Sequence, residues 1–320
     1  TEAPGLVRSD LAWPAQAPPV LVFARQCLPD AVEQRCPSVT AWSEALFQAV
    51  VARLPAHQPW SLHVVPHYGS GTAGQNRCRF IRESLCDLLQ RKCRRLLRAL
   101  EEAPVSFAPT HSLVQLLLTA PDRGLLSVAL APAPFQFRRL VSPFPKGEVP
   151  VASDKAPPSR AFAKLVEAEL RLGRRIACGD TCVDLGASPG SWTYVALQRG
   201  ARVVAVDRAP LRADLMRHPR LTFRQGNAFS FTPERPVDWL LCDVIAAPER
   251  SIGLLLDWVR QRRARSFVVT IKFKGRADYA KLEELKRALP PLCEEFFLTR
   301  LCANKNEACA FGVVRPPESG

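Results

Sequence analysis

The second half of the chain alternates short apolar segments with longer amphipathic ones. The apolar segments have the length of strands, and the segment 237–243 is apolar almost throughout, as a parallel strand buried on both faces is. The predicted strands are 182–185, 202–207, 221–224, 237–243, 266–273, 295–302 and 307–314. Helical patterns separate most of them, at 159–176, 191–199, 211–217, 250–263 and 278–289. This alternation predicts a doubly wound α/β sheet, and the closing hairpin predicts that its last strand enters antiparallel.

The first half has a different pattern. Helical periodicity is predicted over 41–54 and again over 77–103, where apolar residues recur at three- and four-residue intervals. Strands are predicted at 61–65, 111–118 and 124–130, the last two around a turn. We therefore predict a smaller α+β domain over 1–140. A proline-dense stretch without periodicity, 141–158, is predicted to be the linker to the α/β domain over 159–320.

The charge changes this picture most in the first half. The chain has 320 residues, and 44 Lys+Arg against 30 Asp+Glu leave a net charge of +14. Such a balance favours a polyanionic partner, either nucleic acid or an acidic membrane surface. Within 77–98 there are eight basic and two acidic residues, or +6, whereas all of 1–150 has sixteen and eleven, or +5. This helix is therefore either a solvated basic face or a phosphate-contacting one. The residues assigned to phosphate contact are Arg91, Lys92, Arg94, Arg95 and Arg98.

Several classes of protein are disfavoured. No run approaches eighteen uninterrupted apolar residues. Residues 1–8, which include Glu2, precede no apolar segment of the kind a signal peptide has. The eleven cysteines are odd in number and contain no C-x-x-C pair, which favours buried thiols in a reducing compartment over a disulfide scaffold or zinc finger. We expect a cytoplasmic protein without a metal site.

The turn after the strand 182–185 is the sharpest candidate for a ligand site. Gly186 and Gly190 allow the backbone to approach a bound molecule, and the helix that follows offers free amide groups. Asp207 ends the next strand, where it either accepts from a ribose diol or caps the following turn. The loop matches neither G-x-G-x-x-G nor G-x-x-x-x-G-K, so a dinucleotide fingerprint and a phosphate-cradling loop are excluded. The candidate ligand-binding residues are Asp184, Gly186, Ser188, Pro189, Gly190, Ser191, Trp192, Asp207, Asn227 and Asp243.

Four further motifs carry a family resemblance. The segment 158–165 reads Pro-Ser-Arg-Ala-Phe-Ala-Lys-Leu and supplies Lys164, and the fourth strand ends at Asp243. The next strand ends at Lys272, and the last begins at Glu307. In this order the four residues resemble the Lys–Asp–Lys–Glu tetrad of the S-adenosylmethionine-dependent RNA 2′-O-ribose methyltransferases. The chain is most similar to the bacterial members that modify a cytidine of 23S rRNA, strongly over 140–315 and patchily over 20–140.

The resemblance carries several expectations. It implies a Rossmann-like class I methyltransferase sheet of seven strands, preceded by a shortened THUMP-like RNA-binding domain. It implies S-adenosyl-L-methionine as cofactor, no metal, and 23S rRNA or a ribosomal precursor as partner of a monomer. Lys272 would act as general base or orient the 2′-OH, with Lys164, Asp243 and Glu307 around it. A lysine base needs a lowered pKa, which burial and a second lysine favour and neighbouring carboxylates oppose. Ser191 and Asn227 depart from the residues that this family often has there.

Other functions stay open at this point. The protein could methylate the ribose of another RNA, such as tRNA, a different rRNA or a cap, or it could be a non-catalytic rRNA-binding assembly factor. Amino-group methylation is disfavoured because Val244 and Ile245 follow Asp243, where such enzymes have Pro-Pro-Tyr/Phe. Pyrimidine C5 methylation needs a nucleophilic cysteine, and we expect Cys242 to be a core residue.

Overall fold

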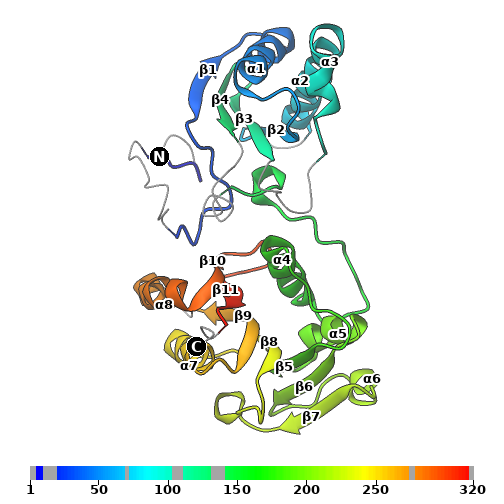
Figure 1. The fold of residues 1–320 in the computed structure, drawn as a ribbon, viewed down its shortest axis with the longest axis vertical. Coiled ribbons are helices and arrows are strands. Elements are labelled where there is room, and N and C mark those ends of the chain that lie inside the picture. Colours follow the sequence, from blue (N-terminus) through cyan, green and yellow to red (C-terminus); the bar gives the residue numbers. More distant parts are fainter. Residues whose placement is uncertain are drawn as a thin grey trace. The chain divides into compact units, whose positions relative to one another are not determined.

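The computed structural model describes residues 5–9, 20–68, 72–102, 111–130, 141–273 and 278–316. It divides into two compact units (Figure 1). Unit 1 comprises Thr1–Pro19 and Arg25–Glu148, and unit 2 comprises Val20–Ala24 and Val149–Gly320. The boundary at Glu148 falls inside the predicted linker. In the described residues no helix is long and apolar enough to cross a membrane.

Unit 1 is a four-stranded sheet with helices, in the strand order β1-β4-β3-β2. Strand β2 pairs in parallel with β3, and the other neighbours are antiparallel. The strands are β1 (Val32–Arg35), β2 (Trp60–Pro66), β3 (Ser112–Ala120) and β4 (Arg123–Ala129). Helices α1 (Val39–Arg53) and α2 (Ala73–Lys92) bury Trp42, Leu46 and Ile81 with the sheet in one apolar cluster. Strand β1 is too short and too exposed to show a periodic pattern, which is why the sequence does not predict it.

The prediction of one long helix over 77–103 is wrong in its second half. Helix α2 stops at Lys92, Cys93 leaves the helical region (φ −153°, ψ 65°), and a short α3 (Arg94–Arg98) follows. Beyond it, Trp60 N donates to Ala99 O at 3.0 Å, and Glu101 N donates to Trp60 O at 2.8 Å. Backbone pairing with β2 therefore replaces the last predicted helical turn.

Unit 2 is a seven-stranded sheet in the order β10-β11-β9-β8-β5-β6-β7 (Figure 1). Strands β5 to β9 are mutually parallel, and β11 is antiparallel to both β9 and β10, which confirms the predicted fold class. The strands are β5 (Thr181–Leu185), β6 (Arg202–Asp207), β7 (Leu221–Gln225), β8 (Val237–Cys242), β9 (Ala264–Lys272), β10 (Cys293–Thr299) and β11 (Glu307–Val314).

Helices cover both faces of this sheet. Helices α4 (Phe162–Leu172), α5 (Ser191–Gln198) and α6 (Ala213–Met216) share one apolar cluster with it. Helices α7 (Pro248–Arg260) and α8 (Leu282–Ala288) share another. The strand order reverses at β5, between β8 and β6, so the carboxyl edge of these strands is where an open α/β sheet binds ligands.

Candidate active site

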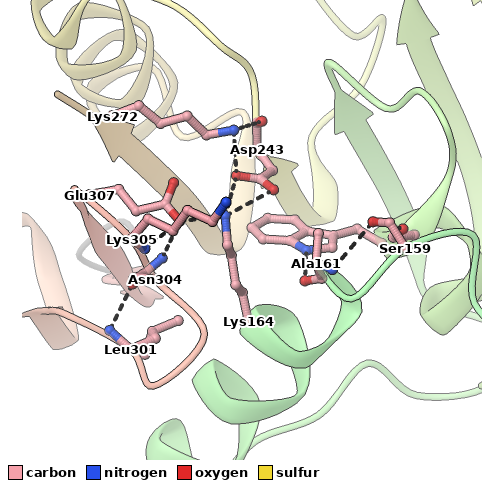
Figure 2. Close-up of polar contacts among 11 residues, drawn as sticks. Ser159, Ala161, Lys164, Asp243, Lys272, Leu301, Asn304, Lys305 and Glu307 are labelled. Atoms are coloured by element: carbon pink, nitrogen blue, oxygen red, sulfur yellow. Dashed lines mark hydrogen bonds and ion pairs between the residues drawn. The ribbon is translucent and has the colours of Figure 1, made fainter. Parts of the chain in front are cut away.

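Four polar side chains meet at the carboxyl edge of the unit 2 sheet (Figure 2). Lys164 comes from the first turn of α4, and Asp243 directly follows β8. Lys272 ends β9 and Glu307 begins β11, and the ladder between these antiparallel strands pairs the two residues directly. The four residues that the sequence singled out as a tetrad are thus brought together from four elements.

Lysines and carboxylates alternate in this cluster. Lys164 Nζ lies 2.7 Å from Glu307 Oε1 and 3.1 Å from Asp243 Oδ1. Lys272 Nζ lies 3.0 Å from the same Asp243 oxygen and also donates to the Asp243 backbone carbonyl at 2.7 Å. Asp243 therefore bridges the two lysines. The side chain of Lys164 is 9% exposed and that of Lys272 is 19% exposed, so Lys272 is the more accessible of the two.

Burial and charge oppose each other at Lys164. Burial lowers the pKa of Lys164, but Asp243 and Glu307 outweigh it, and the net direction is upward. Burial likewise raises the pKa of Glu307, while Lys164 and Asn304 outweigh it and hold that pKa below its usual range. Lys164 is consequently held as a cation between two anions. Of the opposing influences expected from the sequence, the carboxylates prevail at this lysine.

Asn304 completes the cluster and was missed as a site residue. It is 5% exposed, and its Nδ2 donates to Glu307 Oε1 at 3.0 Å, while Leu301 N donates to its Oδ1 at 2.7 Å. On the same loop, Cys302 N donates at 2.7 Å to Glu167, which lies one helical turn beyond Lys164 in α4. The sequence predicted only a polar turn here, because an asparagine in a turn is usually exposed.

The glycine loop lies beside the cluster. Gly186 has φ +75°, and a Cβ there would lie 2.8 Å from Val244 Cβ, next to Asp243. Gly190 has φ +108°, and a Cβ there would lie 2.5 Å from Leu215. Ser188 N donates to Asp207 Oδ2 at 2.9 Å, and Ala209 N donates to its other oxygen at 3.0 Å. Asp207 thus caps the turns around it, which is one of the two roles that the sequence predicted for it. Its side chain is half-buried at the end of β6.

Three more of the candidate ligand-binding residues have side-chain partners inside the protein. Asp184 is buried and accepts from Thr193 Oγ1 at 2.6 Å, and burial raises its pKa to about 7. Trp192 is buried and donates from Nε1 to Ala161 O at 2.8 Å. The Ser191 hydroxyl lies 2.7 Å from that of Ser159. These contacts tie the loop to α5 and to the start of α4, which positions Lys164 (Figure 2).

Asn227 follows β7 on the same edge. Its Oδ1 accepts from Phe229 N at 3.2 Å and so caps the 3₁₀ turn Ala228–Ser230. The Phe229 ring lies under the Arg250 guanidinium, 4.0 Å from it. The amide of Asn227 is exposed, so it can still reach a ligand.

The comparisons with known proteins agree with this geometry. Residues 157–289 match the model of the family described as FtsJ-like methyltransferase. A ribosomal RNA large subunit methyltransferase M from Halorhodospira halophila is 30% identical over 283 residues, which are 87% of this chain and 75% of that relative. The chain belongs to the ribosomal RNA large subunit methyltransferase M family.

Other relatives of the same name match a shorter part of the chain. Those from Stutzerimonas stutzeri and Laribacter hongkongensis are both 39% identical, over 134 and 145 residues. These matches cover 40% and 43% of this chain, and 38% and 41% of the relatives. The matched part of the chain therefore spans about two fifths of the length of these two relatives. The family resemblance stated from the tetrad is confirmed.

Two remaining expectations concern cysteines and metal. Cys242 is fully buried in β8, and burial raises the pKa of its thiol to about 12, so it is a core residue and not a nucleophile. In the part of the chain that the structure describes, no group of three or more His, Cys, Asp and Glu residues could hold a metal ion.

The predicted phosphate-contacting residues lie in unit 1. Arg91 and Lys92 end α2, whereas Arg94, Arg95 and Arg98 belong to α3, and all five side chains are exposed. The Arg91 and Arg94 Nε atoms donate to backbone carbonyls one turn earlier, at 3.2 and 3.1 Å. The break at Cys93 therefore splits this basic surface between two helices.

Proposed function

We propose that this protein transfers a methyl group from S-adenosyl-L-methionine to a ribose 2′-OH of RNA, at a cytidine of 23S rRNA. The observation that carries the proposal is the tetrad, in which Asp243 bridges a buried lysine and a more exposed one. A plain surface ion-pair network would not place four residues from four elements at the ligand edge of the sheet. Family membership supports both the RNA substrate and the methyl donor.

The glycine loop fits this cofactor. A side chain at Gly186 would fill the space against Val244, so the loop keeps its backbone open next to Asp243. The residues that would hold the cofactor are the loop 186–190, with Asp207 and Asn227 at the next two strand ends. When bound, S-adenosyl-L-methionine supplies an electrophilic methyl group and needs no metal.

The protein's own residues would align and deprotonate the hydroxyl. A ribose 2′-OH is a poor nucleophile, so its proton must leave at or near the transition state. Lys164 is held as a cation and serves to fix Asp243 and Glu307. We assign Lys272, the more accessible lysine, as the group that takes the proton or orients the hydroxyl. Asp243 holds Lys272 Nζ in place through both a carboxylate oxygen and its backbone carbonyl. Lys272 takes the proton only as an uncharged amine, whereas as an ammonium it can orient the hydroxyl by donating to its oxygen.

Unit 1 supplies a docking surface in this proposal. Its exposed basic residues on α2 and α3 would contact RNA phosphates, as a THUMP-like domain of a monomeric enzyme would. Phosphate contacts make binding weaken as salt rises. The double variant Arg94→Ala/Arg95→Ala should therefore show a shallower salt dependence of RNA binding than the wild type, and an unchanged slope would leave these residues as a solvated face.

The deciding experiment is methyl transfer from labelled S-adenosyl-L-methionine to unmodified 23S rRNA, with the methylated nucleotide mapped by primer extension. We expect labelling at one cytidine ribose by the wild type and loss of it in Lys272→Ala. The control Lys286→Ala removes an α8 lysine that pairs with Glu283, and it should label normally. Equal labelling by Lys272→Ala would overturn the assignment of the base. Tight RNA binding by a wild type that labels no RNA would favour the assembly-factor function.

A further inference from the structure

The edge of the unit 2 sheet opposite the tetrad carries a row of exposed arginines. The five parallel strands begin at this edge, which we call the amino edge. Each strand is preceded by arginines or has one among its first two residues. The exposed arginines of the amino edge are Arg174, Arg175, Arg202, Arg220, Arg235, Arg262 and Arg265.

Strand pairing places them side by side. Arg202 is paired with Thr181 at the start of β5, and Val203 N donates to Arg220 O at 2.9 Å. On the other side of β5, Arg265 is the second residue of β9, whose first residue Ala264 pairs with the first residue of β8. Neighbouring strands lie about 4.8 Å apart, so the row from β7 to β9 extends over about 19 Å. Strand β6 has six residues, which separates this row from the carboxyl edge by about 17 Å.

Acidic residues compensate only part of this row: Asp238 attracts Arg174 as well as Arg265, and Glu169 attracts Arg175. Among the described residues, Arg265 is the one member of the row with an ion pair, to Asp238 at 3.2 Å, and its side chain is still 75% exposed. Two less exposed arginines nearby do have ion-pair partners. Arg199 pairs with Glu169, and Arg263 pairs with Asp257 at 2.6 Å. The exposed row is therefore available to an external anion.

Helix dipoles explain only part of the row. Cations near a helix carboxyl terminus are stabilising, and Arg174 and Arg175 directly follow α4. Arg202 lies within β6 and Arg220 is four residues beyond α6, while Arg235 follows no α-helix but the 3₁₀ turn Ala228–Ser230. The dipole effect is confined to the last turn of a helix, so these three have no such role.

We infer that the amino edge is a second RNA-binding surface, which contacts the phosphate backbone of the substrate RNA away from the target ribose. This inference rests on the proposed function, because it takes RNA as the ligand. Guanidinium groups bind phosphate through two parallel hydrogen bonds and stay charged at every relevant pH. Binding there positions the RNA without reading its bases, so it is independent of base sequence and sensitive to salt.

The test compares two double variants of the full chain. Arg202→Gln/Arg220→Gln removes two charges from the amino edge, and the control Arg35→Gln/Arg53→Gln removes two exposed arginines of unit 1 that lie outside α2 and α3. The dissociation constant for a 23S rRNA fragment is measured over a series of salt concentrations. The logarithm of the association constant falls as the logarithm of the salt concentration rises. For single-stranded contacts we expect the amino-edge variant to make this fall shallower by about 1.4 in slope, and the control to leave it unchanged.

Methyl transfer separates the two proposals. In the amino-edge variant we expect KM for RNA to rise several-fold while kcat at saturating RNA stays at the wild-type value. Equal slopes for the two double variants would overturn the amino-edge surface, and labelling by the wild type would leave the proposed function standing. If the wild type binds RNA without labelling it, the proposed function fails and the slope alone decides on the amino edge. A wild type that binds no RNA contradicts both, and an acidic protein partner would then account better for the arginines.

Discussion

The two edges of the unit 2 sheet use positive charge in opposite ways. At the carboxyl edge, Lys164 and Lys272 are packed against carboxylates at 2.7 to 3.1 Å. At the amino edge, arginines such as Arg202 and Arg220 are exposed, and no ion pair among the described residues involves them. A lysine held between carboxylates has one fixed position, which suits the alignment of a bound group. An exposed row of cations acts over a longer range and suits a flexible polyanion.

The largest expected effect is at the buried lysine. Lys164→Met leaves Asp243 and Glu307 facing each other without their shared cation. Removing one partner of a buried ion pair costs about 3–5 kcal/mol of unfolding free energy. Urea denaturation should show this loss, with a smaller one in Lys272→Met because Lys272 is more exposed. Equal losses would contradict the difference between the two lysines, and methyl transfer should be lost in both variants.

The pH dependence of stability tests the carboxylate beneath the glycine loop. Burial raises the pKa of Asp184 from 3.8 to about 7, so the folded protein binds a proton that the unfolded chain has released. The stabilisation from that proton is complete below pH 3.8 and is lost as pH rises to about 7. The variant Asp184→Asn has no carboxyl group at this position, so its unfolding free energy does not decrease with pH for this reason. We therefore expect its unfolding free energy, relative to the wild type, to increase from about pH 4 to about pH 7 and then to level off. Parallel curves would contradict the shifted pKa.

The glycines at the two ends of β5 compare the edges directly. Gly186 at the carboxyl end and Gly179 at the amino end both have positive φ, +75° and +88°. A Cβ at Gly186 would lie 2.8 Å from Val244, whereas at Gly179 nothing lies within 4 Å. Gly179→Ala should cost about 1 kcal/mol through backbone strain alone, and Gly186→Ala about 2–3 kcal/mol. Thermal unfolding measures both, and binding of S-adenosyl-L-methionine by calorimetry should weaken only in Gly186→Ala.

The asparagine beside the tetrad should give a moderate effect. Asn304→Ala removes a buried hydrogen bond to Glu307 and should cost about 1–2 kcal/mol. Asn304→Asp places a carboxylate there that repels Glu307 when both are ionised. We expect the unfolding free energy of Asn304→Asp to approach that of the wild type as pH falls and the new carboxyl group binds a proton. If the difference in unfolding free energy between Asn304→Asp and the wild type does not decrease at low pH, a carboxylate at position 304 does not interact electrostatically with Glu307.

The smallest effect is expected at the amino edge. Arg220→Gln removes an exposed side chain with no ion pair among the described residues, so its unfolding free energy should stay within about 0.5 kcal/mol of the wild type. Urea denaturation measures this unfolding free energy, and the salt dependence of RNA binding is measured on the same variant. A loss comparable to that of Asn304→Ala would show that the arginine row stabilises the fold and would weaken its assignment to RNA.

Much of the fold follows from local pattern. Alternating strand and helix periods identified all seven strands of unit 2, because each period depends on residues close in sequence. The failures have tertiary causes. The helical stretch does not continue to residue 103 because backbone groups of Ala99 and Glu101 pair with Trp60, a residue far away in sequence. Asn304 was read as a turn residue because nothing local shows that its side chain is buried.

The order of Lys164, Asp243, Lys272 and Glu307 along the chain was sufficient to identify the family, since each residue stands at a recognisable point of a predicted element. Which of them touch was decided by the sheet. Its parallel strands bring the ends of β8 and β9 to one edge, the antiparallel β11 pairs Glu307 with Lys272, and the packing of α4 inserts Lys164 between two carboxylates. The same packing turned Asp184 and Trp192 inward. Local pattern encodes the period of an element and the type of its residues, but a pairing across 143 residues, from 164 to 307, exists only once the elements are packed.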